Sequence, residues 1–171
     1  MTTLYLPEHR DAFLHLLDIV GKETERLSGV ERRLFAEPID VNWVQELDRQ
    51  PETGERLEAF LSRFSRLQDT IGDKLLPRLR LLLGEAPTHG LDALNRAEKL
   101  GWLPSVDRWM ELRKLRNALV HEYIEDPANL VDALKRVREL LPDLFAAHAA
   151  IVRQADALGL ASNSPGDSAR P

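Results

Sequence analysis

Apolar residues recur along this chain at intervals of three, four and seven positions, the spacing that places side chains on one face of an α-helix. The first series predicts a long helix over about Pro7–Arg33 and consists of Phe13, Leu16, Leu17, Val20 and Leu27. Gly29 is a position at which this helix could end early, because glycine weakens helices. β-branched residues are few and scattered, so helices are favoured throughout.

A second series, from Leu57 to Leu76, predicts another long helix in the middle of the chain. Pro77 is expected to kink or divide it, because the proline ring displaces the carbonyl oxygen four residues earlier. Ahead of this helix, Asp40 is placed to cap a short helix that contains Trp43. Pro51 lies in the connection between the two and is equally suited to open the long helix.

Further helices are predicted in the C-terminal half of the chain. A short one ends at Gly101, and Ser105 then caps a helix over about Val106–Val120. Asp126, followed directly by a proline, starts the last helix, which should bend at Pro142.

The fold class predicted by these series is all-α, an up-and-down bundle of four to five helices with short connections. The last helix, over about Pro127–Leu158, would complete a single domain of residues 1–158. Residues 159–171 are rich in Ser, Ala, Gly, Asn and Pro, and we expect them to form a disordered tail.

Composition narrows the class of protein. Of the 171 residues, 43% are hydrophobic and 30% charged, as is typical of a folded soluble chain, and the absence of cysteine excludes disulfides and thiolate sites. The first residues do not resemble a signal peptide and no apolar run is long enough to span a membrane, so we expect a cytoplasmic protein with no membrane contact. The net charge of −5 limits nucleic-acid binding to a local basic cleft.

One stretch gathers most of the potential chemistry: Arg116, Asn117, His121 and Tyr123 fall within eight positions at the end of a predicted helix. At about 100° per residue, Arg116 and His121 lie about 140° apart around an ideal helix. They can act on one small group only if the helix ends between them or if a second chain contributes. Asn117 is four residues before His121, so its amide can orient the imidazole.

These residue types suit phosphoryl transfer without a metal ion or cofactor. A histidine titrates near neutral pH and can move protons, and an arginine offers a permanent planar set of donors to a phosphate. With RNA, the nucleophile is the 2′-hydroxyl of the substrate, which DNA lacks. The alternative is purely structural, with Arg116 in a surface ion pair and with His121 and Tyr123 packing a helix end.

The spacing of Arg116, four residues, His121, one residue and Tyr123 resembles the R-X4-H-X-Y motif of HepT-type toxins in the HEPN superfamily. The specific match covers eight residues, while the helical layout fits over most of the chain. The resemblance implies a metal-independent endoribonuclease that forms a homodimer, with two copies of the motif lining a cleft and with Arg116 and His121 carrying catalysis. It also implies a partner, a minimal nucleotidyltransferase antitoxin that silences the toxin by adding AMP to Tyr123.

HEPN proteins often place a further polar residue on a middle helix. Asp69 and Asp73, four positions apart, could supply there a carboxylate that orients the catalytic groups. The simpler interpretation of both is a solvated helical face beside Lys74. Two alternatives to a nuclease also stay open: a non-catalytic helical binding subunit of a nucleotidyltransferase, and a helical scaffold with neither activity.

Overall fold

The computed structural model of the chain describes residues 4–121 and 124–160, and at His121 only the backbone. Over these ranges the chain forms helices and no strand, so the predicted all-α bundle is confirmed. The helices are α1 (Arg10–Leu34), α2 (Val41–Gln45), α3 (Pro51–Asp69), α4 (Leu76–Leu82), α5 (Gly90–Lys99), α6 (Val106–His121), α7 (Pro127–Leu140) and α8 (Pro142–Ala157). Short 3-10 turns precede α1 and α3, and a π-helical turn, η3 (Thr70–Leu75), joins α3 to α4.

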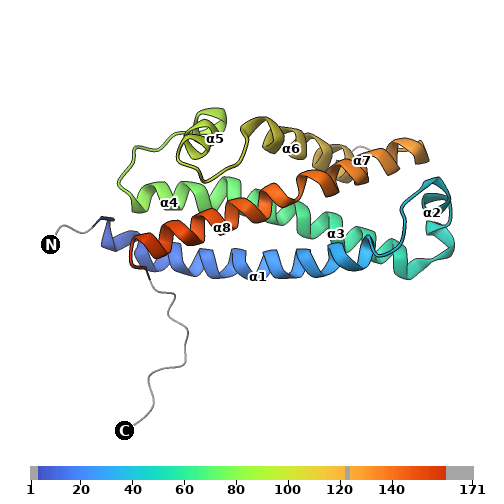
Figure 1. Cartoon of the computed structure of the whole chain (residues 1–171), viewed down its shortest axis with the longest axis horizontal. Coiled ribbons are helices and arrows are strands. Elements are labelled where there is room, and N and C mark those ends of the chain that lie inside the picture. Colours follow the sequence, from blue (N-terminus) through green and yellow to red (C-terminus); the bar gives the residue numbers. More distant parts are fainter. Residues whose placement is uncertain (1–3, 122–123, 161–171) are drawn as a thin grey trace, which may run out of the picture.

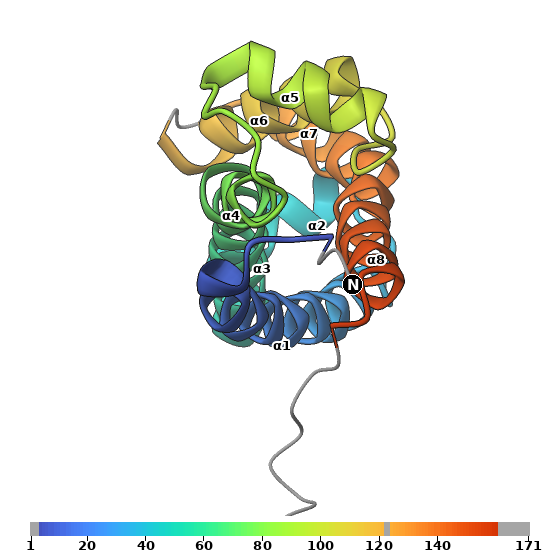
Figure 2. The ribbon, with the colours of Figure 1, turned by 90° about the vertical axis from the view of Figure 1, so that its left-hand side faces the viewer.

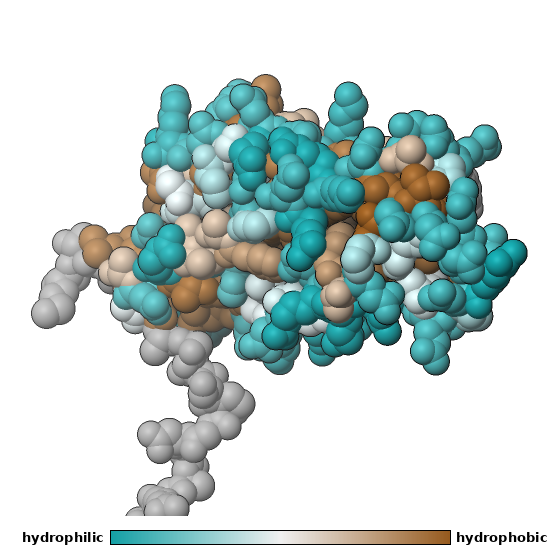
Figure 3. Space-filling model, turned by 45° about the vertical axis from the view of Figure 1, so that its right-hand side comes forward, coloured by the Kyte–Doolittle hydropathy of each residue, from teal (hydrophilic) through white to brown (hydrophobic). Residues whose placement is uncertain are grey.

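The helices surround one elongated core. α1, the α3–α4 pair and the α7–α8 pair follow the long axis of the molecule, whereas α2 lies at one end (Figure 1). Viewed from the other end, α5 and α6 cover the top of the bundle above α4 and α8 (Figure 2). The largest fully buried side chains include Phe13, Phe60, Phe64 and Trp109. Polar side chains cover most of the face in Figure 3, and apolar residues form separate patches on it.

The predicted helix starts are confirmed by the hydrogen bonds at them. Asp40, Ser105 and Asp126 each accept a hydrogen bond from a backbone N–H in the first turn of the following helix, at 2.8, 3.2 and 2.9 Å. Such bonds satisfy donors that the helix itself leaves unpaired. Pro51 occupies the first position of α3, where its missing N–H costs no hydrogen bond.

Two predictions about helix ends are corrected. Gly29 does not end α1, which continues to Leu34 because Leu27, Val30 and Leu34 all pack into the core. The last helix is divided rather than bent, since α7 ends at Leu140 and α8 begins at Pro142. Proline has no N–H to continue the bonding of α7, but it suits the first turn of a new helix.

Pro77 divides the long middle helix through a wide turn placed just before it. In η3 the N–H of Leu76 bonds to the carbonyl of Ile71, five residues earlier instead of four. A π-helical turn inserts one extra residue, and such turns are frequent at functional sites. The wide turn lets α3 pass into α4 although Pro77 has no N–H to donate.

The end of the described chain closes against the core. Gly159 has a φ of +70°, a conformation that favours glycine, and the N–H of Leu160 bonds to the carbonyl of Ala155 at 3.0 Å. Leu160 is only 2% exposed, so packing extends two residues past the predicted boundary at 158. The rest of the predicted tail, residues 161–171, lies outside the described residues. Within the described ranges, no helix is both long enough and apolar enough to cross a membrane.

We predict that His148 makes stability depend on pH. It lines a groove between α1 and α8, near Asp18, Lys22, Glu25 and Asp156, and burial lowers its pKa below the ordinary 6.5. The unfolded chain therefore takes up a proton first, and stability is lost as pH falls from about 6.5 through the folded-state pKa. Urea unfolding at pH 7.5 and about 5.5 should show a larger loss for wild type than for His148→Gln. Equal losses in both proteins would contradict this assignment.

Candidate functional site

α6 carries the Arg116–His121 stretch, and its buried side fixes how the helix is rotated. Trp109 and Leu112 are at most 1% exposed. The Nε2 of Gln68, a fully buried residue of α3, donates to the backbone carbonyl of Trp109 at 3.1 Å. Gly72, in the π turn, lies so close to Trp109 that a Cβ there would come within 3.1 Å of the indole ring. α6 is therefore held closely against the α3–η3 junction.

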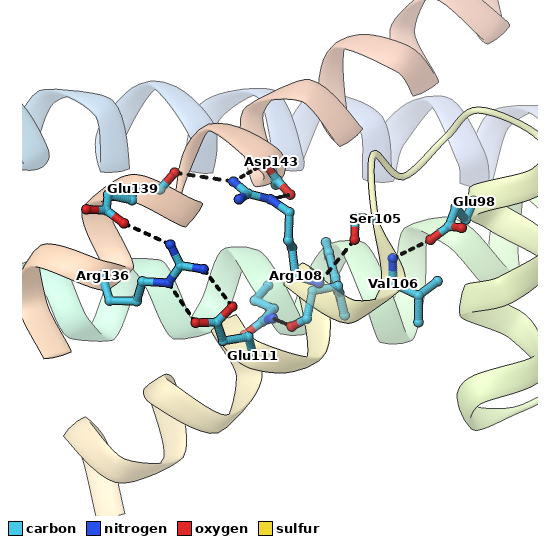
Figure 4. A network of polar contacts seen from close by, with 10 residues as sticks. Glu98, Ser105, Val106, Arg108, Glu111, Arg136, Glu139 and Asp143 are labelled. Carbon is cyan, nitrogen blue, oxygen red and sulfur yellow. Dashed lines mark hydrogen bonds and ion pairs between the residues drawn. The ribbon is translucent and has the colours of Figure 1, made fainter.

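Ion pairs hold the other side of α6 to α7 and α8 (Figure 4). Arg108 donates to both carboxylate oxygens of Asp143, at 2.9 and 3.1 Å, and Arg136 donates to both of Glu111, at 2.6 and 2.9 Å. Arg136 also reaches Glu139 at 2.8 Å. The hydrogen bond from Arg136 lowers the pKa of Glu111, and the one to Asp143 raises the pKa of Arg108. These bidentate pairs set the position of α6 along the bundle.

Arg116 forms an ion pair with Asp69 of α3. Its Nη2 donates to the Oδ2 of Asp69 at 2.6 Å, and the side chains are 20% and 41% exposed. The Nη1 of Arg116 donates to the Oδ1 of Asn117 at 3.2 Å, and its buried Nε has no partner among the described residues. The guanidinium is held on two sides, and its remaining Nη hydrogens can still bind an oxyanion.

The remaining motif residues are described only in part. α6 continues unbroken through His121, so the helix does not end between Arg116 and His121. The side chain of His121 and the whole of Tyr123 lie outside the described residues. Because Asn117 binds Arg116 through its carbonyl oxygen, its NH2 group remains available to a neighbour such as His121.

Asp73 is not at the Arg116 pair. It lies one helical turn further along and contacts Arg113, with Oδ1 3.4 Å from Nη2. Asp69 and Asp73 therefore face two different arginines of α6. Beside the second pair is a cavity of about 280 Å³, which is also lined by Arg80 and His89. In it Arg80 is already paired with Glu85, at 2.9 Å.

The residues that hold this site in position were not predicted from the sequence. Gln68, Arg113 and the Arg108 and Arg136 ion pairs all act between helices that are far apart in sequence. One local signal was present, since Gly72 and Pro77 fall in a single helical series. A glycine and a proline five positions apart indicate an irregular turn where another helix can approach.

Comparison of the chain with known proteins identifies no relative. The chain matches no protein-family model, and no curated protein or solved structure matches it.

Proposed function

We propose that this chain is a HepT-type toxin, a metal-independent endoribonuclease that acts as a homodimer. The observation that carries the proposal is the Arg116–Asp69 pair, at 2.6 Å on a partly exposed face of an unbroken α6. It supports a preorganised guanidinium, which stabilises developing charge without having to reorient during the reaction. The motif resemblance supplies the reaction class.

In the proposed reaction, His121 removes the proton from a 2′-hydroxyl of the RNA. The 2′-oxygen then attacks the adjacent phosphorus, and the bond from phosphorus to the 5′-oxygen breaks. The leaving 5′-oxygen takes a proton from water, and the protonated His121 returns its proton to the solvent, so the products are a 2′,3′-cyclic phosphate and a 5′-hydroxyl end. Arg116 stabilises the charge on the phosphate oxygens, and Asp69 and Asn117 are positioning residues for Arg116.

The homodimer is part of the proposal because of the helix geometry. Along a continuous helix, positions 116 and 121 point about 140° apart. A cleft between two copies of α6 would bring Arg116 of one subunit towards His121 of the other. The exposed Val120 and Met110, 43% and 41% accessible, supply apolar surface on α6 for such a contact.

The activity is tested by incubating purified protein with cellular RNA in excess EDTA. Wild type should cleave, whereas Arg116→Ala and His121→Ala should each be slower by about a hundredfold or more. Arg153→Ala, which removes an exposed arginine from α8, is the matched control and should cleave like wild type. No cleavage by wild type, or equal cleavage by all four proteins, would contradict the proposed ribonuclease activity.

The second candidate is a non-catalytic helical binding subunit of a nucleotidyltransferase. The same ion pair favours it, because an arginine engaged by Asp69 and Asn117 can serve packing alone. In both cases we propose a minimal nucleotidyltransferase as partner, with Tyr123 as the residue that receives AMP. Mass measurement after co-expression with a nucleotidyltransferase encoded beside this gene should show added AMP units that Tyr123→Phe lacks. An unchanged mass would reject the modification.

A further inference from the structure

Three arginines from two helices meet at one small cavity. Arg26 of α1 and Arg63 and Arg66 of α3 line a space of about 140 Å³, together with Glu23 of α1. The Nη1 of Arg63 donates to the backbone carbonyl of Arg26 at 3.3 Å, which ties the two helices together at this point. With three positive charges and one negative charge, the cavity carries a net charge of +2 in a chain of net charge −5.

The guanidinium groups of this arginine cluster are not used by ion pairs of the fold. Among the described residues, none of the three lies within 4.0 Å of a carboxylate oxygen, whereas Arg80, Arg108 and Arg116 all do. The Oε2 of Glu23 is buried and accepts no hydrogen bond in the described part of the chain. Each arginine has five N–H donors, so most of the donors in the cluster remain available to an anion.

One member of the arginine cluster, Arg66, lies one helical turn from the candidate site along α3. Arg66 is three residues before Asp69 on α3, which makes the two neighbours on the helix surface. α3 and α6 are antiparallel here, because Asp69 pairs with Arg116 while Asp73 pairs with Arg113. Moving towards Arg63 on α3 therefore means moving towards the end of α6 at His121, about 7 to 8 Å beyond Arg116.

We infer that the arginine cluster binds a backbone phosphate of the RNA strand, next to the phosphate that is cleaved. The choice of RNA as the ligand rests on the proposed function. The position and the positive charge of the binding site rest on the residues that line the cavity. A planar guanidinium suits phosphate oxygens because it offers paired donors in a fixed geometry. An acidic chain needs such a local site, since its overall charge repels RNA. The negative charge of Glu23 weakens phosphate binding at the cluster. Removing that charge should therefore increase the affinity for RNA, whereas removing an arginine should decrease it.

The test measures binding of a short single-stranded oligoribonucleotide carrying 2′-O-methyl groups, which blocks the nucleophile and prevents cleavage. Fluorescence anisotropy at several salt concentrations gives the affinity and its salt dependence. Replacing both Arg63 and Arg66 by Gln should weaken binding about tenfold and reduce the slope of log affinity against log salt by about 0.7, the change expected for one phosphate contact on a single strand. Glu23→Gln should strengthen binding about two- to threefold. Arg153→Gln on α8 should match wild type, and melting curves should show all variants folded.

The outcomes separate this inference from the proposed function. Unchanged affinity in the double variant, no effect of Glu23→Gln, or no binding by wild type would overturn the arginine cluster as a phosphate site. If these affinities change as expected while natural RNA is not cleaved, the phosphate site stands and the nuclease fails. If natural RNA is cleaved equally by wild type and the double variant, and their affinities are equal, the nuclease stands and the phosphate site fails.

Discussion

Mixing the Arg116→Ala protein with the His121→Ala protein is expected to restore cleavage activity that neither protein has alone. In a symmetric dimer with shared sites, a heterodimer of these variants has one complete site and one site that lacks both residues. Random exchange makes half of the dimers heterodimers, so the mixture should reach about a quarter of wild-type activity. The starting activities should be lower than wild type by about a hundredfold or more, so the gain is easily measured.

The physical reason for this result lies in α6 and in the Asp69 contact. α6 is continuous from Val106 to His121, so positions 116 and 121 keep the angular separation of a regular helix. Arg116 is also held towards α3 of its own chain by Asp69. A single subunit cannot turn Arg116 towards the opposite side of α6 without breaking that ion pair, whereas a second subunit can approach from outside.

The control is the Arg116→Ala/His121→Ala double variant mixed with each single variant. None of those dimers contains a complete site, so no activity should return. Subunit exchange is verified by size-exclusion chromatography of a tagged and an untagged copy. Activity that stays at the level of the single variants, despite verified exchange, would contradict a shared site.

Much of the fold could be predicted because the start of a helix is determined by residues that are close to it in sequence. Asp40, Ser105 and Asp126 are polar caps next to their helices, and no distant residue is needed to recognise them. Gly29 shows where local reasoning failed, since the cost of a glycine is offset by apolar contacts of α1 that only the folded bundle supplies. Pro77 was correctly expected to interrupt a helix, but the form of the interruption depends on the helix that packs beside it.

The position of the candidate site along the chain could be predicted from the sequence, but the contacts between its residues could not. Arg116, Asn117, His121 and Tyr123 fall within eight consecutive positions, so their spacing is visible as a local sequence pattern. The partner of Arg116 is 47 residues away, and nothing in the local pattern of Asp69 separates it from Asp73. Which aspartate reaches Arg116 depends on the register between α3 and α6, and Trp109 against Gly72 sets that register.

Trp109→Ala is expected to give the largest loss of stability of any single change in α6. Trp109 is 1% exposed, and removing a buried aromatic ring typically costs about 3–5 kcal/mol of the free energy of unfolding. Gly72 cannot fill the space, because it has no side chain and belongs to the π turn. Urea unfolding should show a lower midpoint, and the variant should also lose order around Arg116, since the variant lacks the indole ring that packs α6 against Gly72 of the π turn.

Trp109→Phe separates packing from polar effects at the same position. The indole Nε1 is buried and makes no hydrogen bond with the described residues, so replacing it by a phenyl ring removes volume but no such bond. Trp109→Phe should therefore cost clearly less than Trp109→Ala, about 1–2 kcal/mol. Trp43→Ala, in α2 at the end of the bundle, is the control: it should lower stability without loss of order around Arg116. Equal losses in the Phe and Ala variants would mean that Nε1 has a partner, and that the close contact with Gly72 is not what holds α6 in register with α3.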